Sequence, residues 1–374
     1  MPCLNEELTL EACIEEAIEG AKSAGAEVEI IVSDNGSTDR SKEIAKSLGC
    51  TVVEVPIRGY GAALDAGIKA ATTPYVVMGD SDLSYDFREA PKFVAELQNG
   101  ADIVIGNRFK GGIHKGAMPW HHKYVGNPVL SLLGRTFFSI PIRDFHCGLR
   151  AVKQDKYFES APTTTGMEFA TEMIARFANS NSIFKEIPTQ LRKDGRNRKP
   201  HLRSFPDGWR HLKMMLLFSP QFFQLYPGIV LGIIGLLGLT SFAVQGAINL
   251  LVAEGSLQTA IFSSVFFAVG IQLISASIVS MAYAKSKNVM RFRPWRRIEK
   301  IVTSKSFFIA SLLLISASLA ALLGIGGLWL NSNFPAVDPI GESRRTLPLI
   351  SLLIAGIQGV ICSIQTRQLL SKFW

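Results

Sequence analysis

Hydrophobic positions divide the chain into two parts with different patterning. Up to about residue 205, short apolar runs that are rich in β-branched residues alternate with helix-length stretches. The short runs predict strands at Val28–Val32, Val52–Val55, Tyr75–Met78 and Asp102–Ile105. The longer stretches predict helices at Glu6–Ala24, Arg40–Leu48, Ala62–Ala71 and Phe87–Asn99. This alternation is typical of an α/β domain in which helices cover both faces of a parallel sheet.

The start of the chain departs from that pattern. The first helix is predicted from Asn5-Glu6-Glu7 with no strand ahead of it, whereas a doubly wound sheet usually opens on a strand. Either the native chain begins upstream of Met1 or the sheet does without this strand, and we favour the first interpretation. We therefore expect an α/β domain over residues 1–204 whose first strand is missing.

The second part of the chain is much more apolar. Four stretches without Asp, Glu, Lys or Arg follow one another between Gly228 and Thr366, and each exceeds the roughly 20 residues that a helix needs to cross a bilayer. They predict spans at about residues 228–253, 259–284, 306–330 and 346–367, within a transmembrane domain over 228–374. In total, 48% of the chain is hydrophobic and 19% is charged, against about 25% charged residues in soluble proteins. A wholly soluble protein is excluded.

The connecting segment over residues 205–227 mixes aromatic and basic residues. Trp209 and Phe218 stand among Arg210, His211 and Lys213 on what we expect to be short helices. Such helices, placed directly before a membrane span, are typical of amphipathic segments that lie in the membrane interface. An ordinary connector helix that packs against its neighbours is the alternative.

Much of the net charge of +8 comes from one loop. Residues 285–305, between the second and third predicted spans, carry eight Lys and Arg residues against Glu299 alone. The positive-inside rule places this loop in the cytoplasm, and with four spans it places the α/β domain and the C-terminal tail there as well. We therefore expect a multi-pass protein of the inner (cytoplasmic) membrane. The loop explains the charge without a nucleic-acid partner, and it can also hold anionic lipid headgroups.

Three polar loops follow predicted strands, where open α/β sheets bind their ligands. They are Asp34-Asn35-Gly36-Ser37-Thr38-Asp39, Asp80-Ser81-Asp82 and Gly106-Asn107-Arg108. Asp80 and Asp82 form a DxD pair, and one or two carboxylates with phosphate oxygens and water are a typical ligand set for Mg²⁺ or Mn²⁺. Most such pairs are solvated loop acids, but this one directly follows a strand of an α/β domain. The Asp34 carboxylate can accept hydrogen bonds from a base or ribose. The alternative, which can hold at the same time, is a turn in which Ser37 or Asp39 caps a helix.

Five motifs, in this order, resemble the family 2 glycosyltransferases. They are Pro2–Glu7, Asp34–Asp39, the DxD pair, Gly106–Phe109 and Asp144–Arg150. More narrowly, these motifs and the four following spans are similar to the polyprenyl-phosphate and dolichyl-phosphate sugar transferases, such as dolichol-phosphate mannose synthase. The resemblance implies a GT-A fold, the Rossmann-like fold of nucleotide-diphospho-sugar transferases. It also implies inverting transfer of a sugar from a UDP- or GDP-sugar to a polyprenyl (undecaprenyl or dolichyl) phosphate, which makes a lipid-linked monosaccharide for cell-envelope or glycoprotein glycan assembly.

The resemblance also implies roles for residues on the donor side. Those that would border the nucleoside are Pro2, Leu4, Glu6, Val32 and Asp34. Asp80 and Ser81 would flank the donor, and Asp82 would be the principal ligand of Mg²⁺ or Mn²⁺. Ser84 stands where the family often has a Gln that also binds the metal, and it is a weaker ligand. The family closes a basic loop over the donor diphosphate, and the residues at that place in this chain are Arg192, Arg196, Lys199 and His201. The alternative for these residues is a solvated basic loop ahead of the membrane spans.

On the acceptor side, Arg108 matches the family arginine that meets the acceptor phosphate. Lys123 stands where a second arginine is often found, and Asp144 matches an acidic residue with a structural or orienting part. A phosphate acceptor is already anionic at neutral pH, so the site needs positive charge and alignment rather than a strong general base. We accordingly expect the histidines of this region to be packing or hydrogen-bonding residues, namely His121, His122 and His146.

Other classes of protein fit the sequence less well. A processive polysaccharide synthase also joins this fold to membrane helices, but its usual Gln-x-x-Arg-Trp motif is absent from the sequence. A non-catalytic membrane scaffold that had kept an inactive transferase domain would not need both DxD carboxylates and Arg108. A transporter usually carries ionisable residues inside its spans, and the four charge-free stretches lack them. A homo-oligomer is expected from the family resemblance alone.

Overall fold

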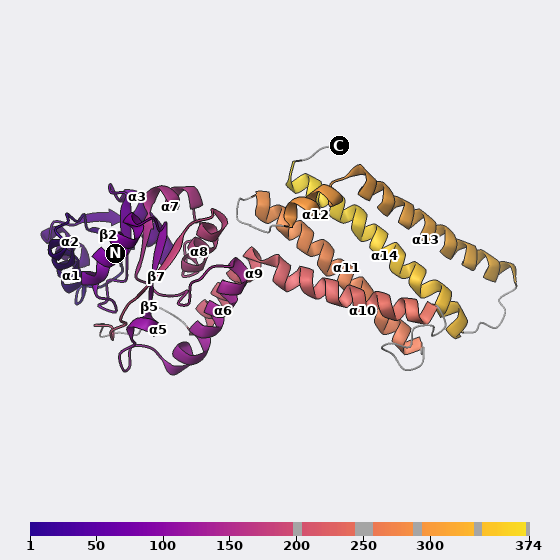
Figure 1. Cartoon of the computed structure of the whole chain (residues 1–374), viewed down its shortest axis with the longest axis horizontal. Coiled ribbons are helices and arrows are strands. Elements are labelled where there is room, and N and C mark those ends of the chain that lie inside the picture. The colour runs from indigo at the N-terminus through magenta and orange to yellow at the C-terminus, as the bar shows by residue number, and fades with distance from the viewer. Residues whose placement is uncertain (197–203, 244–256, 287–293, 333–338, 372–374) are drawn as a thin grey trace. The chain divides into compact units, whose positions relative to one another are not determined.

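The structure of the protein, a computed structural model, describes residues 1–196, 204–243, 257–286, 294–332 and 339–371 (Figure 1). It divides into two units, Met1–Phe218 and Ser219–Trp374. Strands and helices alternate in the first unit, and the elements described in the second unit are helices. Each unit has buried hydrophobic clusters of its own.

The first sheet is parallel, with strands in the order β1-β2-β3. These strands are β1 (Pro2–Cys3), β2 (Ile31–Asp34) and β3 (Thr51–Glu54). Pro2 lies opposite Ser33 on β2. The prediction that the first strand is missing is therefore wrong, because a strand of two residues precedes the first helix. This strand is short because Asn5, with a positive φ of 58°, turns the chain away from the sheet, and helix α1 (Leu10–Ser23) begins later than predicted.

The second sheet is mixed, with strands in the order β4-β6-β5-β7. Its strands are β4 (Tyr75–Met78), β5 (Ile103–Asn107), β6 (Arg150–Lys153) and β7 (Phe184–Pro188). β6 runs antiparallel to both β4 and β5, whereas β5 and β7 are parallel. The expectation of a parallel sheet is corrected for this part of the unit. β6 inserts between β4 and β5 after a long excursion of the chain, which returns it in the opposite direction.

Helices separate the strands as the alternating pattern predicts (Figure 1). In chain order they are α2 (Ser41–Ser47), α3 (Tyr60–Ala70), the 3₁₀ turn η1 (Phe87–Glu89), α4 (Ala90–Gln98), the short α5 (Arg108–Gly111), η2 (His122–Gly126), α6 (Asn127–Phe138), α7 (Gln154–Ser160) and α8 (Phe169–Asn179). Phe93 of α4 and Phe177 of α8 are fully buried in the main core. Apolar residues on one face of these two helices therefore pack into the core of the unit.

Helix α9 (Ser204–Phe218) ends the first unit and is amphipathic. It packs against α6 and α8, with Met215 buried in the main core and the His211 ring bonded to the Thr171 hydroxyl at 2.8 Å. On its other side, Phe205 and Trp209 are exposed. One face of α9 therefore packs against neighbouring helices, as in an ordinary connector helix. That its exposed face lies in the membrane interface stays a prediction.

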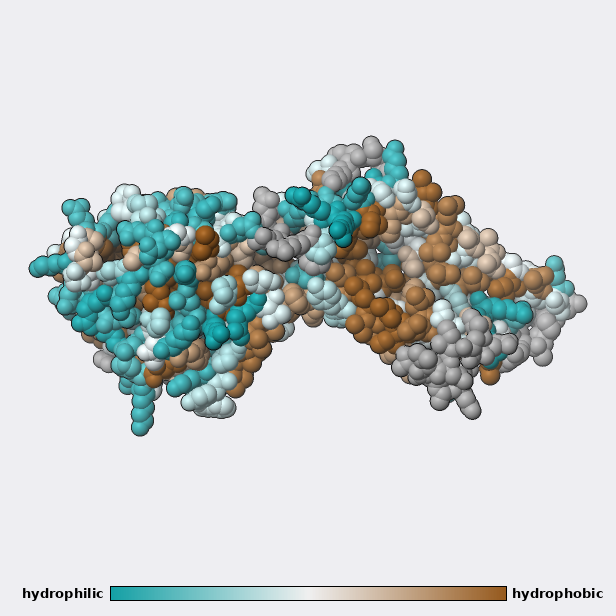
Figure 2. All heavy atoms as spheres, in the orientation of Figure 1, coloured by the Kyte–Doolittle hydropathy of each residue, from teal (hydrophilic) through white to brown (hydrophobic). Residues whose placement is uncertain are grey.

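The second unit consists, in the residues described, of η3 (Gln221–Leu225), α10 (Tyr226–Ala243), α11 (Leu257–Ser286), α12 (Trp295–Val302), α13 (Lys305–Asn331) and α14 (Pro339–Leu369). Four helices in it are long and apolar enough to cross a membrane, namely Gln221–Ala243, Leu257–Ser286, Lys305–Asn331 and Ile340–Leu369. Hydrophobic side chains dominate much of their outer surface (Figure 2). The prediction of four long apolar helices is confirmed; residues 244–253 of the first predicted span, and three basic residues of the predicted cytoplasmic loop (Lys287, Arg291 and Arg293), lie outside the described residues.

Candidate active site at the DxD loop

The DxD motif lies in the loop that leaves the carboxyl end of β4, as predicted. Two hydrogen bonds tie this loop to the start of the chain: the Ser81 hydroxyl donates to the carbonyl oxygen of Pro2 at 2.7 Å, and the Thr9 hydroxyl donates to that of Ser81 at 2.7 Å. The loop turns at Leu83, whose φ of 66° is unusual for a residue with a side chain. Residues from the ends of β1 and β4 consequently meet at one place.

Both carboxylate oxygens of Asp82 are engaged. Its Oδ1 accepts hydrogen bonds from the backbone N–H of Ser84, at 3.0 Å, and from the Ser84 hydroxyl. Its Oδ2 lies 2.7 Å from Nη1 of Arg196. Because the Asp82 side chain is also buried, a cation that binds Oδ2 has to take the place of the Arg196 guanidinium.

Arg196 joins two acidic residues that are far apart in the sequence. Besides Asp82, its guanidinium binds the Glu6 carboxylate, with Nε and Nη2 at 2.9 and 2.6 Å from Oε1. Two backbone hydrogen bonds place the segment that carries it, from Gly195 N to Asp82 O at 2.9 Å and from Arg192 N to Ser84 O at 2.8 Å. The structure thus brings together three predicted donor-side residues. Lys199 and His201 lie outside the described residues.

Asp80, the first acid of the motif, is half-buried two residues before Asp82. Burial, together with the nearby charge of Asp82, raises the pKa of Asp80 to about 6. Near neutral pH this carboxyl therefore carries a proton part of the time. A positive ion placed between the two acids would relieve their repulsion and favour the ionised form of Asp80.

Asp80, Asp82 and Ser84 can supply only part of the ligand set of a divalent metal. Among the residues described, no group of three or more His, Cys, Asp or Glu side chains is arranged to hold a metal ion. Two carboxylates and the Ser84 hydroxyl are nevertheless hard oxygen ligands, and Mg²⁺ is commonly held by one or two carboxylates together with phosphate oxygens. The loop therefore suits a cation that arrives with a diphosphate rather than a cage of protein ligands alone.

In the polar loop after β2, residues 34–39, the two Asp side chains accept hydrogen bonds from nearby backbone N–H groups. The buried Asp34 carboxylate accepts hydrogen bonds from the backbone N–H groups of Gly36 and Ser37, each at 3.2 Å. Asp39 does the same for the backbone N–H of Ser41 at 3.0 Å, where α2 begins. The turn interpretation of this motif is therefore what the structure shows. A base or ribose could reach Asp34 only by competing with these contacts.

The remaining residues predicted for the nucleoside divide into two groups. Pro2 and Leu4 are half-buried at the end of β1, next to the DxD loop. Val32 is instead buried in a hydrophobic cluster with Leu10, Ile14 and others, so the structure does not bring its side chain to the site. In a strand, neighbouring residues face opposite sides of the sheet, and Val32 takes the core side.

Arg108 is held in a buried ion pair directly after the carboxyl end of β5. Its Nε and Nη2 each lie 2.7 Å from an oxygen of the fully buried Asp144 carboxylate, and its backbone N–H donates to the same group at 2.9 Å. Burial alone would lower the pKa of Arg108, but Asp144 outweighs it and holds the pKa well above the usual value. The pair fixes the guanidinium in one orientation, while the part of Asp144 in catalysis stays a prediction.

Lys123 lies on η2, half-buried, with its ammonium nitrogen 5.5 Å from the centre of the Tyr124 ring. Burial, the neighbouring His121 and the charge of Arg108 together lower the pKa of His122. The His146 ring, 4.5 Å from the ring of His211, has a pKa well below its usual range because it is buried. The lowered pKa makes each of these two histidines a weaker base, while their part as packing residues stays a prediction.

A band of large apolar side chains on η2, α6 and α9 is exposed. On the approach to η2 and within it, Trp120 and Tyr124 are 71% and 68% exposed, and the band continues with Val125 of η2 and Leu132 of α6. On α9, which packs against α6, Phe205 and Trp209 are 86% and 60% exposed. The first unit therefore carries an apolar surface on the helices that lead to its last residue.

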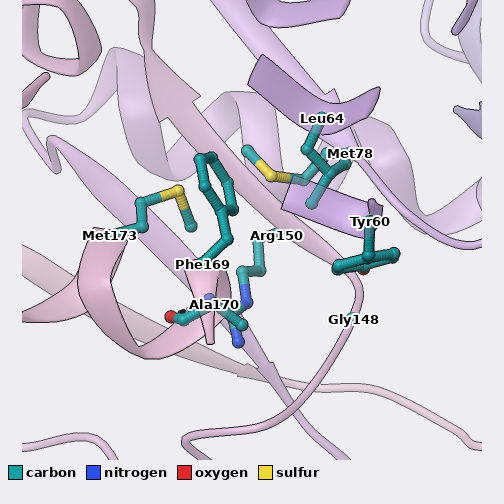
Figure 3. Close-up of a pocket in the computed structure, with 8 residues that line it drawn as sticks. All are labelled: Tyr60, Leu64, Met78, Gly148, Arg150, Phe169, Ala170 and Met173. Atoms are coloured by element: carbon teal, nitrogen blue, oxygen red, sulfur yellow. Dashed lines mark hydrogen bonds between the residues drawn. The ribbon is translucent and has the colours of Figure 1, made fainter. Parts of the chain in front are cut away.

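A small pocket is lined by Tyr60 and seven further residues (Figure 3). Its other lining residues are Leu64, Met78, Gly148, Arg150, Phe169, Ala170 and Met173. The Arg150 guanidinium donates to three backbone carbonyls, of Phe145, Cys147 and Ala170, at 2.7 to 2.8 Å. Arg150 is therefore a structural residue that holds the Asp144 loop, and the pocket is part of the core behind the site.

Sequence reasoning missed three residues of this region. Tyr60 lies between two glycines that serve packing, because a Cβ at Gly59 or Gly61 would lie within 2.5 Å of an atom of residues 165–169. The Tyr60 hydroxyl opposes the rise in the pKa of Asp80. Thr9 and Glu16 also act on the DxD loop, and Glu16 binds Arg192 with 2.8 and 2.9 Å contacts. Single polar residues on an amphipathic helix carry no sequence signal for such contacts.

Comparisons with known proteins agree with the geometry. Residues 1–158 match the family described as Glycosyl transferase family 2. The low-salt glycan biosynthesis hexosyltransferase Agl6 of Haloferax volcanii is 34% identical over 350 residues, which cover 90% of this chain and 81% of that protein. A dolichyl-phosphate hexose transferase of the same organism is 31% identical over 164 residues, 44% of this chain and 70% of that protein.

Among solved structures, glucosyl-3-phosphoglycerate synthase from Mycobacterium tuberculosis is similar with a TM-score of 0.45 and 22% identity, over 57% of this chain and 76% of that one. The family match and the extent of similarity to the hexosyltransferase establish the relationship. This chain belongs to glycosyl transferase family 2: it is a glycosyltransferase with a GT-A α/β unit, followed by a helical region in which four helices are apolar enough to cross a membrane.

Proposed function

We propose that this transferase moves the sugar of a UDP- or GDP-sugar to a polyprenyl phosphate, with inversion at the anomeric carbon. The observation that carries the proposal is the meeting of Glu6, Asp82 and Arg196 at the carboxyl end of β4. This group holds acidic oxygens for a cation and a guanidinium for a diphosphate within one hydrogen-bonded set. The helices that could cross a membrane, and the relative named as a dolichyl-phosphate hexose transferase, support a lipid acceptor.

On the donor side, Asp82 and Asp80 would hold Mg²⁺ or Mn²⁺, whose charge would neutralise the departing diphosphate. Arg196 now neutralises Asp82, and on donor binding it would transfer this contact to the diphosphate oxygens. Glu6 would keep the guanidinium near the site during the exchange, since it binds two nitrogens of the same group. Ser84 would continue to orient Asp82 through its backbone N–H.

On the acceptor side, the lipid phosphate supplies the nucleophilic oxygen, and it is already ionised at neutral pH. The chain's part is therefore to align that oxygen and to offset its charge. Arg108 is fixed by Asp144 in one orientation, and Lys123 adds a second positive charge on η2. No side chain needs to remove a proton, which agrees with the lowered pKa values of His122 and His146.

The exposed apolar band on η2, α6 and α9 would meet the hydrocarbon of the acceptor or its bilayer. Tryptophan and tyrosine are typical of the boundary between water and lipid, where one end of the side chain is apolar and the other wet. With the basic loop in the cytoplasm, the α/β unit would work at the cytoplasmic face of the membrane, and its acceptor phosphate would face the same side.

The test is to incubate membranes that contain the protein with a panel of radiolabelled UDP- and GDP-sugars and to extract the lipids. We expect one nucleotide sugar to label the lipid fraction, and the variant Asp82→Asn to lower this labelling about 100-fold, since metal binding supplies several kcal/mol of charge stabilisation. The control is Glu159→Gln, an exposed acid of α7 that binds Lys156. Undiminished labelling by Asp82→Asn would contradict the proposal, and label in a long polymer would favour a processive synthase instead.

A further inference from the structure

Residues Arg192–Arg196, here called the brace segment, do more than supply Arg196. We propose that this segment fixes the conformation of the DxD loop and that the ion pair between Arg192 and Glu16 is the positioning contact that holds it there. The inference rests on the proposed function, because it concerns residues that act on the proposed metal ligand through other groups. Neither Arg192 nor Glu16 touches the reacting atoms in this account.

The DxD loop needs an external support. Leu83, directly after Asp82, has a φ of 66°, a conformation that costs a residue with a side chain on the order of 1 kcal/mol or more. Such a conformation persists only where surrounding contacts determine it. The brace segment supplies two of them, one on each side of Leu83: Gly195 N donates to Asp82 O at 2.9 Å, and Arg192 N donates to Ser84 O at 2.8 Å.

The brace segment approaches the loop closely. A Cβ on Gly195 would lie 2.8 Å from the Thr9 side chain and 3.2 Å from that of Leu83. Thr9 in turn donates to the carbonyl oxygen of Ser81. The loop is therefore enclosed between the start of α1 and the brace segment, with little space for it to take another conformation.

The Arg192–Glu16 pair anchors this arrangement to α1. The guanidinium binds both oxygens of Glu16, at 2.8 and 2.9 Å, across most of the length of the first unit's sequence. Glu16 also accepts a hydrogen bond from the backbone N–H of Phe87, at 3.2 Å, just beyond the DxD loop. One carboxylate thus holds both the brace segment and the exit of the loop against a single helix. The contact between Arg192 and Glu16 is bidentate, a geometry that a lysine at position 192 cannot reproduce.

The chain offers a closely matched control pair. The side chains of Arg192 and Glu16 are 24% and 13% exposed, and those of Lys153 and Asp102 are 25% and 12% exposed at a distance of 3.2 Å. Asp102 also accepts from a backbone N–H, that of Ile183, at 2.9 Å. This pair joins β6 to the start of β5 and has no contact with the DxD loop among those described. Loss of either pair should cost similar stability, but only one should change the metal site.

The experiment measures Mn²⁺ binding by electron paramagnetic resonance, without donor, on the purified full-length protein in lipid nanodiscs. We expect Glu16→Gln and Arg192→Lys to weaken Mn²⁺ binding about 10-fold, the lower end of the effect of residues that orient metal ligands. Asp102→Asn should leave the affinity unchanged although it lowers the melting temperature comparably. In transfer assays, the variants at Glu16 and Arg192 should regain most of their activity at high Mn²⁺, so that their KM for metal rises while kcat changes little.

Unchanged Mn²⁺ affinity in Glu16→Gln and Arg192→Lys, or an equal loss in Asp102→Asn, would overturn the inference. The double exchange Glu16→Arg with Arg192→Glu adds an independent outcome, since a positioning contact predicts stronger Mn²⁺ binding in the double variant than in Glu16→Arg alone. Failure of the proposed function is distinguishable, because then the unaltered protein itself would bind no Mn²⁺ or label no lipid.

Discussion

Two arginines of the α/β unit pair with buried carboxylates, and their contacts differ. Arg108 and Asp144 satisfy one another through two side-chain contacts and a backbone hydrogen bond. Arg196 instead bridges Glu6 and Asp82, and one of its partners is an acid of the DxD pair. Because Asp82 lies beside a second acid whose pKa is raised, we propose that its arginine contact holds the place of a cation. The acidic surroundings of Asp82, and not the ion pair itself, are the reason to propose that this contact is exchanged during the reaction.

The largest effect should come from breaking the Arg108–Asp144 pair. Asp144→Asn leaves the buried Arg108 guanidinium without its negative partner, which typically costs about 3–5 kcal/mol of unfolding free energy. We expect a strong fall in the melting temperature measured in detergent and a loss of activity that follows the loss of folded protein. An Asp144→Asn protein as stable as the unaltered one would show that Arg108 is not held as described.

Breaking the contacts of Arg196 with Glu6 and Asp82 should have a different result. Arg196→Gln removes the charge that neutralises Asp82, so transfer to lipid should fall about 100-fold, as when one preorganised donor to a developing charge is lost. The melting temperature should fall less than in Asp144→Asn. Mn²⁺ binding without donor should become tighter, because Oδ2 of Asp82 is released. Weaker Mn²⁺ binding would indicate that Arg196 organises the acids rather than competing with the cation.

The acidic pair should respond to pH in a direction set by Asp80. Its pKa is raised from 3.8 to about 6, so Asp80 stabilises the fold while protonated and loses this contribution as the pH rises through about 6. We expect Asp80→Asn to be more stable than the unaltered protein by an amount that grows between about pH 5 and pH 7. Over the same range, the rise in melting temperature caused by Mn²⁺ should increase in the unaltered protein.

Thermal unfolding at about pH 5 and pH 7, with and without Mn²⁺, measures both quantities. Comparison with Asp80→Asn removes the contribution of other carboxyl groups, such as Asp86, whose pKa is lowered mainly by its bonds with Arg88 despite partial burial. A stability difference that does not vary with pH would show that Asp80 titrates normally in the folded protein.

The smallest effect concerns Lys123. This lysine is half-buried on η2 and binds phosphate only as a single positive charge. Lys123→Ala should therefore raise the KM for the polyprenyl phosphate about 3-fold and leave kcat nearly unchanged, the scale of a partly solvated charge contact. A large fall in kcat would contradict this prediction and would indicate that Lys123 stabilises the transition state instead of binding the acceptor.

The fold could be predicted where the signal is local. The run Tyr75–Met78 forms β4 with those bounds, because four consecutive apolar residues favour a strand whatever its partners are. β6 and its antiparallel direction depend on which strands it inserts between, a relation that no local pattern encodes. β1 escaped prediction because two residues show no periodicity, and it exists only through its pairing with β2.

The site could be predicted as residue types but not as contacts. The motifs identified Glu6, Asp82 and Arg196, and the structure brings them together. The same motifs assigned Val32 to the nucleoside, while the alternation of the strand turns its side chain into the core. The Glu16–Arg192 pair joins positions far apart on the chain, so only the folded arrangement shows it.

The central claim is that a nucleotide sugar and a lipid phosphate react at the acidic pair. The most direct measurement is sugar transfer by the purified protein in nanodiscs that contain a polyprenyl phosphate, supplied with the radiolabelled nucleotide sugar selected by the panel and with Mn²⁺ or a chelator. The account predicts labelled lipid that forms with Mn²⁺, is lost with the chelator and releases its sugar in mild acid. Label transferred to a water-soluble acceptor, or formed equally in the chelator, would contradict it.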